Sequence, residues 1–108
     1  MKPAPIFVDA RRLSAWLLEH FDGRDSVLGR RLCTTALDLL RAVTLALKDR
    51  CREDQIERAD EELIALRVEL RLAEETGLLD EEQVLYALGE ADGIGRQLGG
   101  WRRSLGAV

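Results

Sequence analysis

Hydrophobic residues recur three or four residues apart in four segments of the chain, and polar residues fill most positions between them. This spacing places the hydrophobic side chains on one face of a helix. It predicts helices over about 8–20, 27–50, 54–76 and 80–104. The third segment has the most regular seam, in which steps of three and four residues alternate through Ile56, Ala59, Leu63, Leu66, Leu70 and Ala73.

Residues that favour turns and helix ends separate most of these segments. Either Asp25 or Ser26 is a suitable N-cap for the second helix. Gly77 stands where a helix commonly ends in a left-handed residue, and Asp80 is a suitable N-cap for the fourth helix. The break near 50–54 has neither Gly nor Pro, but we expect a reversal there because the uninterrupted helix would be very long.

Short connections between amphipathic helices place successive helices antiparallel. We therefore predict an all-α fold in which residues 1–108 form a single domain, an up-down-up-down four-helix bundle. The second and third segments carry more hydrophobic positions than one bundle needs, and this surplus supplies surface for contact between copies of the chain. The additional positions are Leu37, Leu40, Thr44 and Leu47 in the second segment and Ile64, Val68 and Leu72 in the third.

Four glycines interrupt the hydrophobic seam of the fourth segment: Gly93, Gly95, Gly99 and Gly100. A glycine inside a helix costs about 0.5–1 kcal/mol relative to alanine. Another interaction must offset this cost, and we expect a neighbouring helix to approach closely at these positions.

Charge is unevenly distributed along the chain, although the net charge is only −4. Residues 1–52 carry ten basic and six acidic side chains, residues 53–92 carry three and fourteen, and residues 93–108 carry three basic ones and no acidic one. In an antiparallel bundle, the start of the first helix, the connection after the second and the end of the fourth lie together. That end is predicted to be basic and the opposite end more acidic. The basic end gathers Arg11, Arg12, Lys48, Arg50, Arg52, Arg102 and Arg103.

The sequence lacks the residues that common catalytic and metal sites require. His20 is the only histidine, and Cys33 and Cys51 lie too far apart on one predicted helix to form a disulfide or a zinc site. We therefore expect a binding or assembly protein and not an enzyme, with neither a cofactor nor a metal ion. The opening residues do not form a secretory signal, and no apolar run is long enough to span a membrane. A cytoplasmic location is expected.

Three segments resemble a known family of four-helix bundles. They are LGRRL at 28–32, ALRVELRLA at 65–73 and IGRQLGGW at 94–101. In this order and spacing the chain is similar to the family that contains Avd, the accessory variability determinant of diversity-generating retroelements. The same family includes proteins encoded by intervening sequences of 23S rRNA. The similarity covers about residues 7–105, and the segment at 94–101 is its most specific part.

The resemblance implies a homopentamer, in which five bundles form a barrel around a central channel. It also implies two partners, the retroelement reverse transcriptase and the template-repeat RNA, which together support mutagenic synthesis of cDNA. The alternative is a stand-alone RNA-associated protein of the intervening-sequence type. The acidic pI of about 5.0 opposes the approach of RNA, so the polymerase is the stronger of the two predicted partners.

The predicted site residues are mainly arginines, because arginine makes bidentate contacts with phosphate and carboxylate groups. The resemblance implies that Arg67, Arg71 and Arg96 are motif arginines, which lie either in interhelical ion pairs or at the partner surface. We expect a mixed role, with Arg96 the more structural. The predicted RNA-binding or partner-binding residues are Arg11, Arg12, Arg30, Arg31, Lys48, Arg52, Arg67, Arg71, Arg102 and Arg103. The predicted structural or interface residues are Arg96, Gly99, Gly100 and Trp101.

Overall fold

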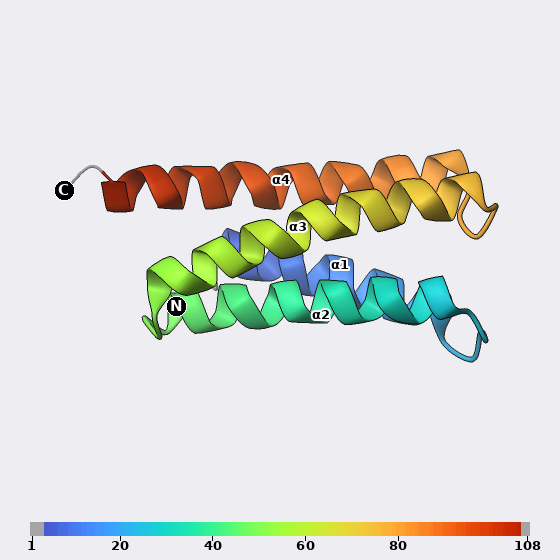
Figure 1. The fold of residues 1–108 in the computed structure, drawn as a ribbon, viewed down its shortest axis with the longest axis horizontal. Coiled ribbons are helices and arrows are strands. Elements are labelled where there is room, and N and C mark those ends of the chain that lie inside the picture. Colours follow the sequence, from blue (N-terminus) through green and yellow to red (C-terminus); the bar gives the residue numbers. More distant parts are fainter. Residues whose placement is uncertain (1–3, 107–108) are drawn as a thin grey trace.

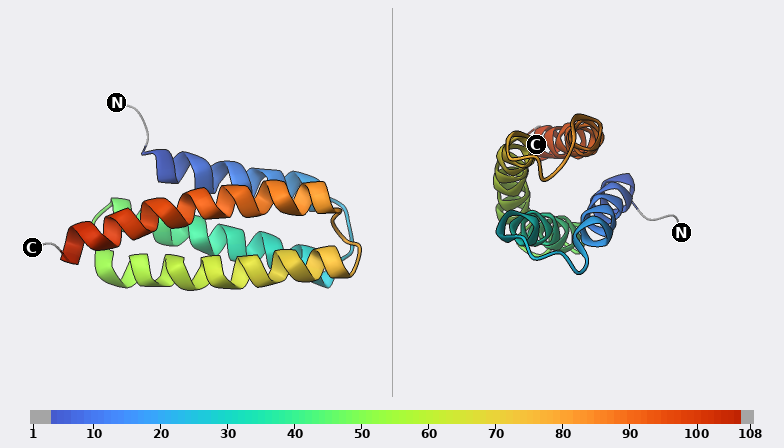
Figure 2. Two further views of the ribbon diagram at one scale, coloured as in Figure 1. Left: turned by 90° about the horizontal axis from the view of Figure 1, so that it is seen from above. Right: turned by 90° about the vertical axis from the view of Figure 1, so that its right-hand side faces the viewer.

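The computed structural model describes residues 4–106, and within this range the protein is all-helical, as predicted. The helices are α1 (Pro5–Phe21), α2 (Val27–Leu47), α3 (Arg52–Glu75) and α4 (Glu81–Gly106). Each helix runs back along the one before it, and all four lie roughly parallel to the long axis of the molecule (Figure 1). Seen end-on, they follow one another around the bundle in chain order (Figure 2). This arrangement agrees with the predicted antiparallel four-helix bundle.

The observed helix boundaries differ most from the predicted ones at the start of α1 and at the end of α2. Helix α1 begins at Pro5, three residues early, because proline has no N–H to lose in the first turn. Helix α2 ends at Leu47 and not at 50. The connection that follows reverses through Asp49 and Cys51, which have positive φ angles of 61° and 50°.

Side-chain caps hold the start of α2 and α4. Ser26 caps α2, since its Oγ accepts a hydrogen bond of 3.0 Å from the backbone N–H of Gly29. Asp80 caps α4, where its Oδ1 accepts a 2.8 Å bond from the N–H of Gln83, whose Oε1 accepts a 2.9 Å bond from the N–H of Asp80. Gly77 has a φ of 78° after α3, as predicted for a helix end.

The predicted seam of α3 forms the centre of the core. All six of its residues are at most 2% exposed, and they pack with buried side chains from the other three helices. Helix α2 comes close to α1 at Gly29, where an added Cβ would lie 2.7 Å from the ring of Phe21. The start of α2 can therefore pack against the end of α1 only because Gly29 has no side chain.

The glycines of α4 do not mark close helix packing, and that prediction is wrong for three of the four. A Cβ at Gly93, Gly99 or Gly100 would meet only arginine side chains of α4 itself within 4 Å. Gly95 alone faces another helix, where a Cβ would lie 2.8 Å from Nη2 of Arg67. These glycines therefore leave space for arginine side chains and not for a neighbouring backbone.

The two cysteines lie in different surroundings. Cys33 is partly buried on α2, and burial raises the pKa of its thiol. Cys51 is exposed and precedes α3. The expectation that both belong to one helix is therefore wrong, because the chain reverses between them.

Candidate functional site

A groove lies between α3 and α4. It has a volume of about 530 Å³, and three arginines, two aspartates and two glycines line it: Asp60, Arg67, Asp92, Gly95, Arg96, Gly99 and Arg103. Arg67 and Arg96 come from two of the segments that carry the family resemblance, and the fold brings them together from different helices. We treat this arginine groove as the candidate site.

Arg67 lines the arginine groove and reaches from α3 to α4. Its Nη2 lies 3.5 Å from Oδ1 of Asp92. Gly95 makes this path possible, because a Cβ at that position would lie 2.8 Å from the same nitrogen. Arg67, and not Arg96, therefore makes the interhelical ion pair among the three motif arginines.

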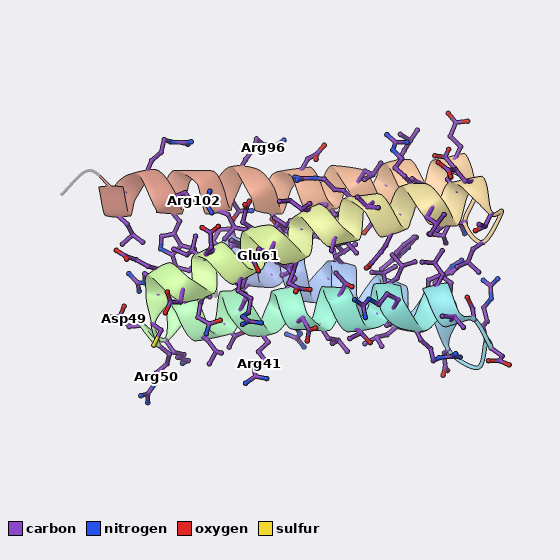
Figure 3. The ribbon with its side chains drawn as sticks, in the orientation of Figure 1. Arg41, Asp49, Arg50, Glu61, Arg96 and Arg102 are labelled. Atoms are coloured by element: carbon purple, nitrogen blue, oxygen red, sulfur yellow. The ribbon has the colours of Figure 1, made fainter. Side chains whose placement is uncertain are left out.

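Arg96 and Arg103 lie along the other side of the groove and are both exposed. Neither makes an ion pair with any residue in the range 4–106. Figure 3 shows Arg96 extending from α4 away from the bundle. An added Cβ at Gly93 would lie 3.8 Å from Nη2 of Arg96, and one at Gly99 would lie 3.4 Å from Nη1 of Arg103. Both guanidinium groups thus lie close to backbone that carries no side chain.

The two aspartates of the arginine groove are engaged by other arginines. Asp92 pairs with Arg67, and Oδ2 of Asp60 lies 3.6 Å from Nη2 of Arg102. The donors of Arg96 and Arg103 are therefore available to an anion from outside. Guanidinium groups bind phosphate or carboxylate in bidentate geometry, so the groove is suited to an anionic partner surface.

Arg12 has a structural position that the sequence did not indicate. Its Nη2 lies 2.8 Å from Oδ1 of Asp9 and 2.9 Å from Oε2 of Glu90, so it joins α1 to α4. Hydrogen bonding to Glu90 is the main reason why the pKa of Arg12 is raised. Glu90 is far from the end of α4, so Arg12 lies towards the middle of the bundle and not at the predicted basic end.

Most other arginines of the predicted set pair with carboxylates of this chain. The pairs are Arg30–Asp25 (3.0 Å), Arg31–Glu69 (3.5 Å), Arg52–Asp49 (3.3 Å), Arg71–Glu74 (3.2 Å) and Arg102–Glu57 (3.1 Å). Such partly exposed pairs add little stability, but they reduce the charge that an anionic partner meets. Arg11 and Lys48 are exposed and make no ion pair within the part of the chain that the structure describes.

Trp101 is a partly buried residue that packs against the core near the end of α4. The guanidinium carbon of Arg52 lies 5.6 Å from the centroid of its ring, within the range of a cation–π contact. Gly100, directly before it, faces only the side chain of Arg103 within 4 Å. The end of α4 is therefore anchored to the start of α3 by an aromatic side chain and an arginine.

His20 is part of an aromatic cluster at the end of α1. Its ring stacks on Trp16 with centroids 5.7 Å apart, and its Nε2 lies 3.0 Å from Nη1 of Arg24. Because guanidinium can only donate, Nε2 is the acceptor and the imidazole is neutral. Burial, followed by the charge of Arg24, lowers the pKa of His20.

Sequence reasoning missed the carboxylates that decide which arginines are available. Asp60, Asp92 and Glu90 lie at positions that face a neighbouring helix, and each pairs with an arginine far away in the sequence. The only feature of the sequence that could have indicated these ion pairs was the position of each acidic residue beside the hydrophobic seam. It does not identify the partner, because that depends on how the helices are rotated against each other.

No protein-family model, curated protein or solved structure matches this chain. Among residues 4–106, no helix is long and apolar enough to cross a membrane. In the same range, no group of three or more His, Cys, Asp or Glu side chains could hold a metal ion.

Proposed function

We propose that this protein is a non-catalytic accessory protein of a diversity-generating retroelement. In this role it acts as a homopentamer that binds the reverse transcriptase and its template RNA and so supports mutagenic cDNA synthesis. The observation that carries the proposal is the arginine groove, in which Arg96 and Arg103 have no ion-pair partner within residues 4–106. The resemblance of segments 28–32, 65–73 and 94–101 to the Avd family supplies the identity of the partners.

The charge of the helices supports a division of roles between the two partners. Helix α3 carries four basic and nine acidic side chains between Arg52 and Glu75. Such a helix repels RNA and attracts a basic protein surface. The arginine groove is the better site for RNA phosphates. The acidic end where α3 ends and α4 begins, with Glu75, Glu81 and Glu82 exposed, is the better site for a basic polymerase.

A pull-down from the native host tests the proposal directly. The tagged protein should recover a reverse transcriptase together with one structured RNA, both identified by mass spectrometry and sequencing. An Arg96→Ala/Arg103→Ala variant should recover less RNA. Recovery of neither a polymerase nor a specific RNA by the unmodified protein would overturn the proposal.

Salt dependence measures whether the arginine groove contacts phosphate. Each phosphate contact releases counterions, so loss of two arginines should lower the slope of log affinity against log salt by about 2. The matched control is Arg50→Ala/Arg58→Ala, which removes the same charge from exposed positions outside the groove. Equal slopes for the two double variants would show that the groove is not the phosphate site.

Recovery of RNA without any polymerase would favour the alternative, a stand-alone RNA-associated protein of the 23S rRNA intervening-sequence type. The same groove would then act alone. The two outcomes are distinguished by the proteins in the eluate, since only the retroelement role requires a polymerase.

A further inference from the structure

The outward face of α2 is basic and has an exposed leucine at its centre. Between Val27 and Leu47 this helix carries three arginines and one aspartate. Leu37 is 42% exposed, and Arg41 is exposed without an ion pair within residues 4–106. Figure 3 shows Arg41 extending from α2 away from the bundle.

The outward face of α3 has the opposite charge and a longer apolar stripe. Ile64 and Val68 are 56% and 65% exposed and lie four residues apart, so they are neighbours on the helix surface. Glu57 and Glu61 precede them on the same face. Glu57 pairs with Arg102, whereas Glu61 makes no ion pair with any residue that the structure describes.

The basic and acidic groups of the two faces lie at matching levels along the bundle. Helices α2 and α3 are antiparallel, and the Arg31–Glu69 pair shows which residues are level with each other. Arg41 lies ten residues after Arg31 on α2, so it is level with position 59 of α3, which lies ten residues before Glu69. Position 59 is between Glu57 and Glu61. Figure 3 shows Arg41 and Glu61 at the same position along the long axis. By the same relation, Leu37 is level with position 63, beside Ile64.

A closed ring brings residues at the same level together. Copies related by rotation about an axis parallel to the bundle have no shift along that axis, so each residue meets a neighbour at its own level. We propose that copies of this chain associate through these two faces, with α2 of one copy packed against α3 of the next. Leu37 then contacts Ile64 of the next copy, and Arg41 pairs with its Glu61.

The angle between the two faces favours a small ring. Neighbouring helices of a four-helix bundle face outward about a quarter-turn apart. Faces that diverge by about 90° to 110° close after about four or five copies. In such a ring the boundary between α2 and α3 faces the central axis, and α4 lies on the outside. Arg96 and Arg103 therefore remain accessible to a partner.

This inference rests on the self-association included in the proposed function and adds which surfaces meet. Its test is a charge exchange, with Arg41→Glu and Glu61→Arg made singly and together. Mass is measured by light scattering after size exclusion, over a dilution series. The unmodified chain should form one ring species of several copies. Each single variant should raise the dissociation constant at least tenfold, because like charges then face each other, and the double variant should recover assembly.

Two control variants carry the same size of charge change on other faces. The replaced residues, Arg11 on α1 and Glu82 on α4, are both exposed. The Arg11→Glu and Glu82→Arg variants should therefore assemble as the unmodified chain does. Circular dichroism should show equal helix content in all variants. A monomeric unmodified chain, unaffected single variants or a double variant that stays dissociated would each overturn the proposal. Recovery of polymerase and RNA in the pull-down remains a separate readout: unaffected single variants of an assembled chain would overturn the contact between α2 and α3 and leave the proposed function standing.

Discussion

Helix α3 has two apolar stripes of similar composition in opposite surroundings. Leu63, Leu66 and Leu70 face the core and are fully buried, whereas Ile64 and Val68 on the other side are 56% and 65% exposed. The side chains of the two stripes are equally apolar, but the inner stripe continues through six positions from Ile56 to Ala73, whereas Glu57 and Glu61 precede the outer one on its face. In the fold, α2 and α4 cover the inner side of α3 and leave the other side open. The inner stripe therefore stabilises the fold, and the outer stripe is available for association.

Shortening an inner residue should have the largest effect. Leu66→Ala should lower the free energy of unfolding by about 2–5 kcal/mol, because it removes buried methyl groups and leaves a cavity. Val68→Ala on the outer stripe is the control, and it should change the stability of the single copy by no more than about 0.5 kcal/mol. Urea unfolding at a concentration where the chain is dissociated checks both. Similar losses for the two variants would remove the distinction between the stripes.

Filling the contact at Gly29 should have the next largest effect. Gly29→Ala places a Cβ 2.7 Å from the ring of Phe21, and the ring cannot move freely because Phe21 is buried. We expect a loss of about 1–3 kcal/mol, the usual cost of overpacking a tight contact. Thermal unfolding followed by circular dichroism provides the measurement. A stabilised variant would mean that the helices do not pack this closely.

Gly89→Ala tests the same substitution where the surroundings are open. A Cβ at Gly89 meets nothing within 4 Å. Alanine should therefore stabilise the protein by about 0.5–1 kcal/mol, since it restricts the unfolded chain and favours the helix. Measured beside Gly29→Ala, it should show the opposite sign. A loss at Gly89 would indicate that another surface covers this face of α4.

The smallest effect is expected at the polar boundary between α2 and α3. Burial, together with Asp38 and Glu69, raises the pKa of Glu62, although Arg58 and Arg31 oppose the shift. A raised pKa in the folded state means that ionised Glu62 costs stability above that pKa, and the cost fades as the pH falls through it towards the unfolded value. Glu62→Gln should therefore stabilise the protein at pH 7, by up to about 0.5 kcal/mol.

The pH dependence of this gain is the critical measurement. Urea unfolding of both proteins at pH 7 and pH 4 should show the difference shrinking at the lower pH, where Glu62 is protonated in the folded state. A difference that is equal at both pH values would mean that charge is not its cause.

Helix identity and core were predictable from the sequence, but the environment of each charge was not. The spacing of Ile56 and Leu63 depends only on the helical repeat, so it could be recognised locally. The pairing of Arg12 with Glu90 joins residues 78 positions apart and depends on the relative rotation of α1 and α4. For the same reason, the roles of Arg67 and Arg96 within the arginine groove could not be assigned from the motif alone.

Local chemistry accounts for the four helices, their caps at Ser26 and Asp80 and the buried seam of α3, because each depends on residues close together in the chain. Packing of the helices decided which carboxylates the arginines beside that seam meet, and which arginines keep a guanidinium without an ion pair within residues 4–106. The glycines of α4 were expected to contact a neighbouring helix, but in the fold they leave space for arginine side chains. These properties depend on distances between helices, and such distances arise only when all four helices pack together.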